Sequence, residues 1–164
     1  MTVYISGKIG EEVISEATRQ KFAKAQKEPE SKGHEVFNPT SEEWQNHLMH
    51  GYGADIQQRI APPGGPISKY AYFLLRDQMA LATKDAIYML SDWKDSAGAR
   101  TELMFALATG KKVIFEHEED FLDNYMKLAE NLVRTAMLTN SDALSYIFET
   151  RGGCKVELEV KRRK

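Results

Sequence analysis

The chain has 164 residues, of which 42% are hydrophobic and 28% are charged, and its formal net charge is −2. This length suits one domain with a sizeable core, and the balance of residues is that of a globular protein rather than a disordered one. The near-neutral charge argues against nucleic acid as a partner. No apolar run approaches the ~18 residues that a membrane-spanning helix needs, so we expect no membrane partner.

The cysteine and histidine residues indicate the cellular compartment and whether a metal ion is bound. The single cysteine, Cys154, cannot form an internal disulfide, and no secretory signal pattern is visible at the N-terminus, so we expect a cytoplasmic protein. His47 and His50 are spaced to share a helix face, but two ligands do not make a structural zinc site. We therefore expect no bound metal.

Short apolar runs alternate with helical patterns along the first part of the chain. The run TVYIS at 2–6 predicts a strand, and a glycine-bearing turn follows it. A polar helix is expected from about Glu12 to the region of Pro29, which should end or kink it. The segment 33–39 then predicts a second strand, which its asparagine-proline pair ends.

Residues 40–69 are less regular. Residues 41–50 predict a helix with Ser41 as its cap, and APPGGP at 61–66 is a loop that cannot continue a helix or a central strand. We expect this stretch to cross the sheet edge or to cover a site.

The middle of the chain returns to regular alternation. Residues 68–85 predict a helix that is apolar nearly all round and therefore well buried. The apolar run DAIYML at 85–90 is typical of a parallel-sheet strand. A loop and a helix follow, and KKVIFE at 111–116 predicts a fourth strand.

The last third of the chain has the weakest pattern. Residues 120–138 predict an amphipathic helix, residues 141–150 a further helix, and residues 152–160 a strand suited to pairing at a sheet edge.

This order of elements predicts an α/β fold. Alternating strands and helices favour a flavodoxin- or Rossmann-like parallel sheet of four to five strands flanked by helices, followed here by a helical and β-like C-terminal tail. We expect a single domain over 1–164, with a core at about 2–138 and a C-terminal extension at 139–164.

Ligands bind beyond the carboxyl ends of the strands in such open sheets. Small or polar residues follow three of the predicted strands here, namely Ser6 and Gly7, then Asn38, then Ser91, Asp92 and Trp93. Trp93 leaves its strand where a base could stack, although a packing role is the more common one for tryptophan.

Two turns rich in small residues are candidate anion sites. Gly7-Lys8-Ile9-Gly10 lets a backbone approach an anion, but a tight turn explains it equally well. It is not G-x-G-x-x-G, and no P-loop sequence occurs, so a dinucleotide fingerprint and a P-loop ATPase are both rejected. Ser96-Ala97-Gly98 begins a helix, where Ser96 can cap the helix and free N–H groups suit a phosphate.

Three further residues carry potential chemistry. Glu102 lies beside an apolar helical stripe. It could be a carboxylate that interacts favourably with the helix start, a partner of Arg100, or an ionised nucleophile or base at the crevice wall. Asp77 interrupts an apolar helix, where a bond to Arg76 or solvent is the plainer explanation. Tyr4 is a core residue by pattern, but its hydroxyl needs a partner when buried.

Together these motifs resemble a known family. VYISGKI at 3–9, RDQMALATKDAIYML at 76–90 and SAGARTELMFALATGKKV at 96–113 are similar to motifs of the nucleoside 2-deoxyribosyltransferase-like superfamily. That group includes deoxynucleoside 5′-monophosphate N-glycosidases and related phage and bacterial proteins. The resemblance covers about Thr2 to Phe115.

The resemblance implies an N-glycosidase or deoxyribosyltransferase acting on a nucleoside or its 5′-monophosphate, without a cofactor and commonly as a homo-oligomer. It implies that Glu102 is the nucleophile on the sugar, that Asp77 is the acid that helps the base leave, and that Tyr4 holds the sugar or the glutamate. It places the 5′-phosphate at a set of small or turn residues, namely Gly7, Lys8, Ile9, Ser96 and Gly98.

The sequence also departs from the family. Arg100-Thr101-Glu102-Leu103 stands where Tyr-Glu-Leu-Gly is common, and residues 44–66 have no clear counterpart, so the base is not predicted. A NAD-glycohydrolase-like enzyme and a module that binds a nucleotide or a partner protein without turnover stay open as alternatives.

Overall fold

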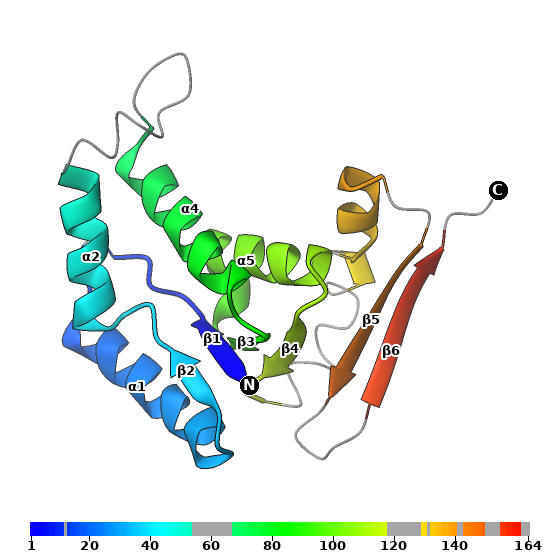
Figure 1. The fold of residues 1–164 in the computed structure, drawn as a ribbon, viewed down its shortest axis with the longest axis horizontal. Coiled ribbons are helices and arrows are strands. Elements are labelled where there is room, and N and C mark those ends of the chain that lie inside the picture. The colour runs from blue at the N-terminus through cyan, green and yellow to red at the C-terminus, as the bar shows by residue number, and fades with distance from the viewer. Residues whose placement is uncertain are drawn as a thin grey trace.

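The computed structural model describes residues 1–11, 13–53, 67–117, 129–130, 132–140, 143–149 and 155–161. The elements follow in the order β1 (Thr2–Ser6), α1 (Glu16–Ser31), β2 (Glu35–Phe37), α2 (Glu42–Gly53), α4 (Lys69–Ala82), β3 (Ala86–Met89), the 3-10 turn η1 (Trp93–Asp95), α5 (Ala97–Ala108), β4 (Lys112–Phe115), β5 (Ala143–Glu149) and β6 (Lys155–Lys161) (Figure 1). Residues 129–130 and 132–138 are also helical. The predicted loop at 61–66 lies outside the described residues.

The first four strands form one parallel sheet in the order β2-β1-β3-β4. β1 is an interior strand, since Tyr4 lies opposite Phe37 of β2 on one side and Ile87 of β3 on the other. The predicted α/β fold, a parallel sheet flanked by helices, is confirmed with four strands in this sheet. The interior position of β1 brings the residues at its carboxyl end next to those that follow β3.

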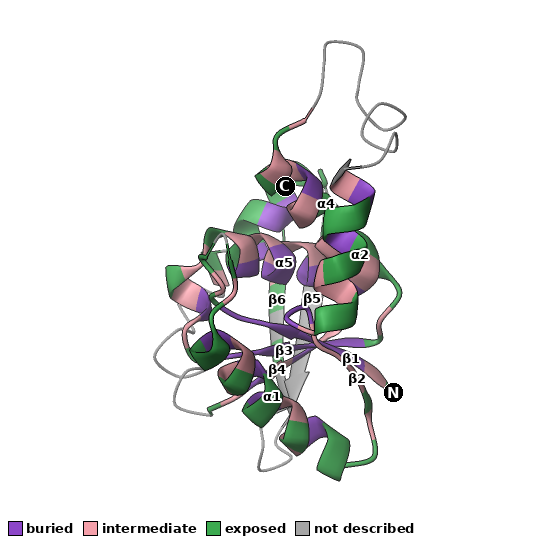
Figure 2. Ribbon diagram, turned by 90° about the vertical axis from the view of Figure 1, so that its left-hand side faces the viewer, coloured by how far each residue is buried: buried purple, intermediate pink, exposed green. Residues whose placement is uncertain are grey.

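Helices cover both faces of the sheet (Figure 2). On one face, Val3 and Ile5 of β1 pack with Phe22 and Ala25 of α1. On the other, the apolar residues of α5 and Leu81 of α4 pack against alternate strand residues, namely Tyr4, Ile87, Met89, Val113 and Phe115. Because strand side chains alternate between faces, Tyr4 and Ser6 both project toward α5.

Helix α1 differs from its expected bounds at both ends. Ser15 caps it by accepting a hydrogen bond from the Thr18 N–H, so the helix begins at Glu16 rather than near Glu12. Pro29 lies inside the last turn, and the helix continues to Ser31.

Helices α2 and α4 lie side by side, with Gly51 of α2 near Tyr72 of α4 and Trp44 of α2 bonded to Asp77 of α4. Ser41 caps α2 as expected, since its Oγ accepts from the Trp44 N–H at 3.3 Å. Gly51 allows the two helices to approach, because a Cβ at this position would lie 2.4 Å from the Tyr72 hydroxyl oxygen. This contact brings α2 against the helix that carries Asp77.

The expectation that α4 is well buried is wrong. Tyr72 and Leu81 are buried, but Tyr70, Leu75 and Met79 expose 62%, 49% and 59% of their surface. Apolar composition around the whole helix does not decide burial here, because α4 packs on the sheet and on its neighbours along only part of its circumference (Figure 1).

The C-terminal region contains a strand where a helix is expected. Residues 141–150 do not form a helix, since β5 pairs in antiparallel register with β6 over Ala143–Glu149 and Lys155–Lys161. The aromatic and β-branched run Tyr146-Ile147-Phe148 favours this pairing. The predicted strand at 152–160 is confirmed as β6, although its partner is β5 rather than the main sheet. The helix predicted at 120–138 is confirmed for its described part.

Lys111 fixes the end of α4 relative to β4. Its buried ammonium donates to the carbonyl oxygens of Ala82 at 2.9 Å and Lys84 at 2.6 Å. We expect Lys111→Met to lower the free energy of unfolding by about 1–3 kcal/mol, since two carbonyl groups lose a charged donor. Urea denaturation measures this loss. Lys24→Met, at an exposed position of α1, is the matched control and should change stability by less than about 0.5 kcal/mol. Equal stability of the two variants would contradict the role given to Lys111.

Candidate active site

A buried carboxyl joins helix α5 to strand β1. Glu102 lies in the second turn of α5 and exposes 7% of its surface. Its Oε1 accepts a hydrogen bond from the Tyr4 hydroxyl at 2.9 Å, and its Oε2 accepts from the Ser6 hydroxyl at 2.5 Å. Since both donors come from β1, the strand holds both oxygens of the carboxyl in one orientation.

Burial changes the ionisation of this group. Burial, and then the nearby charge of Asp77, raise the pKa of Glu102 to about 8, against the lowering effect of the hydrogen bonds from Ser6 and Tyr4. Burial, and then the charge of Glu102, raise the pKa of Tyr4 well above its ordinary value. The raised pKa of Glu102 runs against the expectation of an ionised carboxylate at the helix start, because the effect of burial exceeds that of the hydrogen bonds from Ser6 and Tyr4.

A second carboxyl, that of Asp77, lies on α4. Its Oδ1 accepts a hydrogen bond from Trp44 Nε1 at 2.8 Å. Burial raises the pKa of Asp77 to about 6, and the bond from Trp44 opposes this rise. The neighbouring Arg76 takes a different partner, His47, whose Nε2 lies 2.7 Å from Nη2. The partner of Asp77 is thus an indole N–H rather than a guanidinium.

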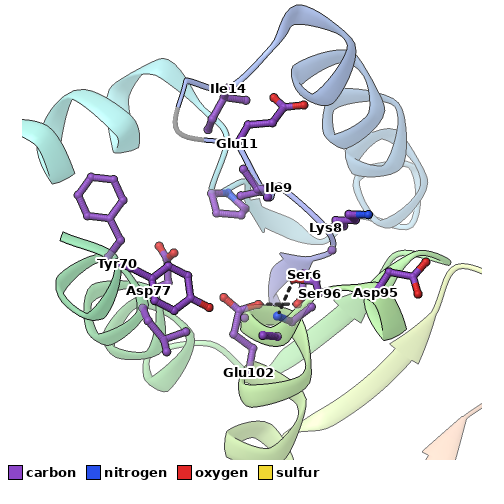
Figure 3. Close-up of a pocket in the computed structure, with 18 of the residues that line it drawn as sticks. Ser6, Lys8, Ile9, Glu11, Ile14, Tyr70, Asp77, Asp95, Ser96 and Glu102 are labelled. Atoms are coloured by element: carbon purple, nitrogen blue, oxygen red, sulfur yellow. Dashed lines mark hydrogen bonds between the residues drawn. The ribbon is translucent and has the colours of Figure 1, made fainter. Parts of the chain in front are cut away.

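The two carboxyls line the same cavity of about 590 Å³. Figure 3 shows Glu102 beside Ser6 and Ser96, with Asp77 and Tyr70 on the facing helix. The remaining wall comes from the turn after β1 and from segments around the starts of α1, α2, α4 and α5. Its residues are Gly7, Lys8, Ile9, Gly10, Glu11, Ile14, Pro39, Gln45, Lys69, Phe73, Leu74, Asp95, Ala97, Gly98 and Ala99. A cavity of this volume suits a small organic ligand of nucleoside size.

Most of the residues singled out from the sequence meet at this cavity. The lining includes Ser6, Gly7, Lys8, Ile9, Asp77, Ser96, Gly98 and Glu102, and Tyr4 reaches the site through its bond to Glu102. Gly7 is required by packing, because a Cβ there would lie 2.5 Å from Leu90 Cδ1. Ser96 caps α5 by accepting from the Ala99 N–H at 3.2 Å, so its side chain has a structural role already.

Asn38, Asp92 and Trp93 lie outside the cavity lining, contrary to expectation. Asn38 shapes the turn after β2, with Oδ1 accepting from the Thr40 N–H at 2.9 Å. Asp92 holds the turn after β1, since it accepts from the Lys8 N–H at 2.9 Å and pairs with Lys21 at 2.6 Å. Trp93 is 1% exposed and belongs to the core, because η1 directs its ring inward.

Several cavity residues were missed from the sequence, above all on α4. Tyr70, Phe73, Leu74 and Asp77 follow the i, i+3, i+4, i+7 spacing of one helix face. That spacing was the available signal, but reading the helix as apolar all round hid the face that ends in Asp77.

The described residues include no group of three or more His, Cys, Asp or Glu side chains placed to hold a metal ion. No helix among them is long and apolar enough to cross a membrane.

The raised pKa of Glu102 makes a prediction about stability. Between its ordinary value of 4.5 and about 8, the folded state holds a proton that the unfolded state releases, so stability falls as pH rises through this window. We expect the free energy of unfolding, measured in urea from pH 5 to 8, to fall less steeply in Glu102→Gln than in the wild type. Asp77, whose pKa is also raised, is present in both proteins and makes the stability of both fall as pH rises. Parallel slopes would mean that Glu102 ionises normally in the fold.

Among solved structures, the chain is similar to a 2-deoxyribosyltransferase from the psychrotolerant bacterium Bacillus psychrosaccharolyticus, with 17% sequence identity, a TM-score of 0.46, and coverage of 70% of this chain and 71% of that one. None of the curated proteins matches the sequence. The model of a domain of unknown function, DUF4406, matches residues 1–115, from β1 to the end of β4. The chain therefore belongs to the DUF4406 family.

Proposed function

We propose that this protein cleaves the N-glycosidic bond of a nucleoside or a (deoxy)nucleoside 5′-monophosphate. The observation that carries the proposal is the buried Glu102 carboxyl, oriented by Tyr4 and Ser6 in a cavity that Asp77 also lines. A rigid carboxylate at a cavity wall suits attack on a sugar carbon, and a second carboxyl with a raised pKa suits proton transfer. The motifs shared with the 2-deoxyribosyltransferase-like superfamily give Glu102 and Asp77 these same roles.

The reaction follows the logic of retaining glycosidases. The ionised Glu102 attacks the anomeric carbon, the carbon–nitrogen bond breaks, and its electron pair leaves with the base. Asp77 donates a proton to the departing base. Water, or the nitrogen of a second base, then attacks the glutamyl–sugar ester and loses its proton to Asp77. Glu102 is released as a carboxylate, and the products are those of hydrolysis or transfer respectively.

The two carboxyls must share their protons correctly for this reaction. Burial raises the pKa of both carboxyls, to about 8 for Glu102 and about 6 for Asp77, so the pair holds one proton in the range between these values. The reaction needs that proton on Asp77. Positive charge that develops on the sugar in the transition state favours the ionised Glu102 and so moves the proton in the required direction.

The cavity has features that suit either substrate form. Lys8 and Lys69 line it as cations, and Ala97 and Gly98 line it at the start of α5, where the helix dipole favours an anion. Glu11 and Asp95 line the same cavity and oppose an anion. A comparison of nucleosides with their 5′-monophosphates therefore belongs in the first activity screen.

A binding module without turnover is the second candidate. The observation in its favour is the raised pKa of Glu102, because a neutral carboxyl binds hydroxyl groups but is a poor nucleophile. Stabilisation of the protein by nucleosides or nucleotides in a thermal-shift assay, without any released base, would favour this function over catalysis.

We expect Glu102→Gln to abolish base release and Asp77→Asn to slow it by roughly 10²–10⁴-fold, the usual contribution of a general acid. The assay follows free base by chromatography from a panel of deoxynucleosides, their monophosphates and NAD, with and without an acceptor base. Glu43→Gln, an exposed glutamate of α2, is the matched control and should leave the rate unchanged. A wild-type protein that releases no base from any member of the panel would contradict the proposal.

A further inference from the structure

Besides Gln45, which lines the cavity, helix α2 contributes a hydrogen bond to the candidate active site. Trp44 Nε1 donates to Asp77 Oδ1 at 2.8 Å, although the two residues lie 33 positions apart in the chain. The structure assigns Trp44 as a positioning residue that orients the Asp77 carboxyl and leaves its Oδ2 to carry the proton for the departing base. This inference rests on the proposed function, and it names a residue that the family motifs do not include.

The chemistry of the indole decides which oxygen carries the proton. An indole N–H can only donate a hydrogen bond, so Oδ1 must accept it in both ionisation states of Asp77. A proton on Oδ1 would compete with the indole hydrogen, whereas Oδ2 has no hydrogen-bond partner among the described residues. Because Asp77 lines the cavity, the fixed carboxyl keeps its acidic oxygen available to a ligand there.

Trp44 is itself held by a row of rings. Its ring meets the Phe37 ring edge-on, with 5.0 Å between the ring centroids, and stacks on the His47 ring, with 5.2 Å between the centroids. Phe37 in turn stacks on Tyr4 at 5.3 Å, and Tyr4 donates to Glu102. The Phe37 ring thus lies between Trp44, which bonds Asp77, and Tyr4, which bonds Glu102. Such ring pairs limit rotation of the indole and so keep its N–H directed at Asp77.

The charged and titratable groups around Asp77 come from several elements. Glu102 of α5 and Tyr4 of β1 interact with its charge, and His47 of α2 stacks on the indole. Arg76, the preceding residue of α4, bonds His47 Nε2, which must then accept because a guanidinium only donates. Burial is the main cause that raises the pKa of Asp77, and the bond from Trp44 lowers it.

The test replaces the indole and keeps an aromatic ring. In Trp44→Phe, we expect the pKa of the Asp77 carboxyl, titrated by carbon NMR in the ligand-free protein, to rise. We expect kcat for base release to fall roughly 10- to 100-fold with KM within about twofold, because misplacement of a catalytic group costs rate rather than binding. The limb of the pH–rate profile that reports the titration of Asp77 should move to higher pH. Trp44→Tyr serves as the second variant if the phenylalanine form does not fold.

Two controls separate positioning from packing. His47→Phe preserves a ring against Trp44 and should leave in place both the Asp77 titration and the limb of the pH–rate profile that reports it. In the Asp77→Asn background, Trp44→Phe should cause little further loss of kcat, since the group that it orients is no longer an acid.

An unchanged Asp77 titration in Trp44→Phe would overturn the inference, and so would full additivity of the two substitutions in kcat. The NMR titration needs no turnover. If the wild type releases no base, the proposed function fails, while the titration still decides whether Trp44 orients Asp77.

Discussion

A carboxyl group removed from water must find hydrogen-bond donors inside the protein, and Glu102 finds two on one strand. The remainder of the site depends on this constraint. Tyr4 and Ser6 can both reach Glu102 because they occupy alternate positions of β1, and β1 faces α5 because it is an interior strand of the sheet. Asp77 then acts on a carboxyl that is already costly to ionise, and the two groups form one coupled pair.

The described groups that form the site lie within the part of the chain that matches the DUF4406 model. Beyond it, Leu132, Leu144 and Val160 pack against the core cluster beneath α5 rather than lining the cavity. The described C-terminal residues therefore extend the core cluster to which the apolar residues of α5 belong. Lys111 holds the end of α4, the helix that carries Asp77.

What the sequence predicted well was local in origin. The parallel strands and the caps Ser41 and Ser96 follow from patterns within short segments. Asp77 and Glu102 were assigned to one site by the family resemblance, and both line the cavity. The errors arose where distant segments decide the outcome. Residues 141–150 form a strand because β6 pairs with them, and Trp93 is buried because the turn at η1 directs it to the core. The bond between Trp44 and Asp77 joins two helices whose packing no local pattern encodes.

The proposed mechanism requires Glu102 to form a covalent bond to the sugar. The most direct measurement is mass spectrometry of the protein after incubation with a 2′-deoxy-2′-fluoro-arabinonucleoside, since the electron-withdrawing fluorine slows breakdown of the intermediate through its oxocarbenium-like transition state. We expect a mass increase equal to one fluorinated sugar on the peptide that contains Glu102, and no increase in Glu102→Gln. Base release from this compound with no adduct on Glu102, or an adduct on another residue, would contradict the mechanism.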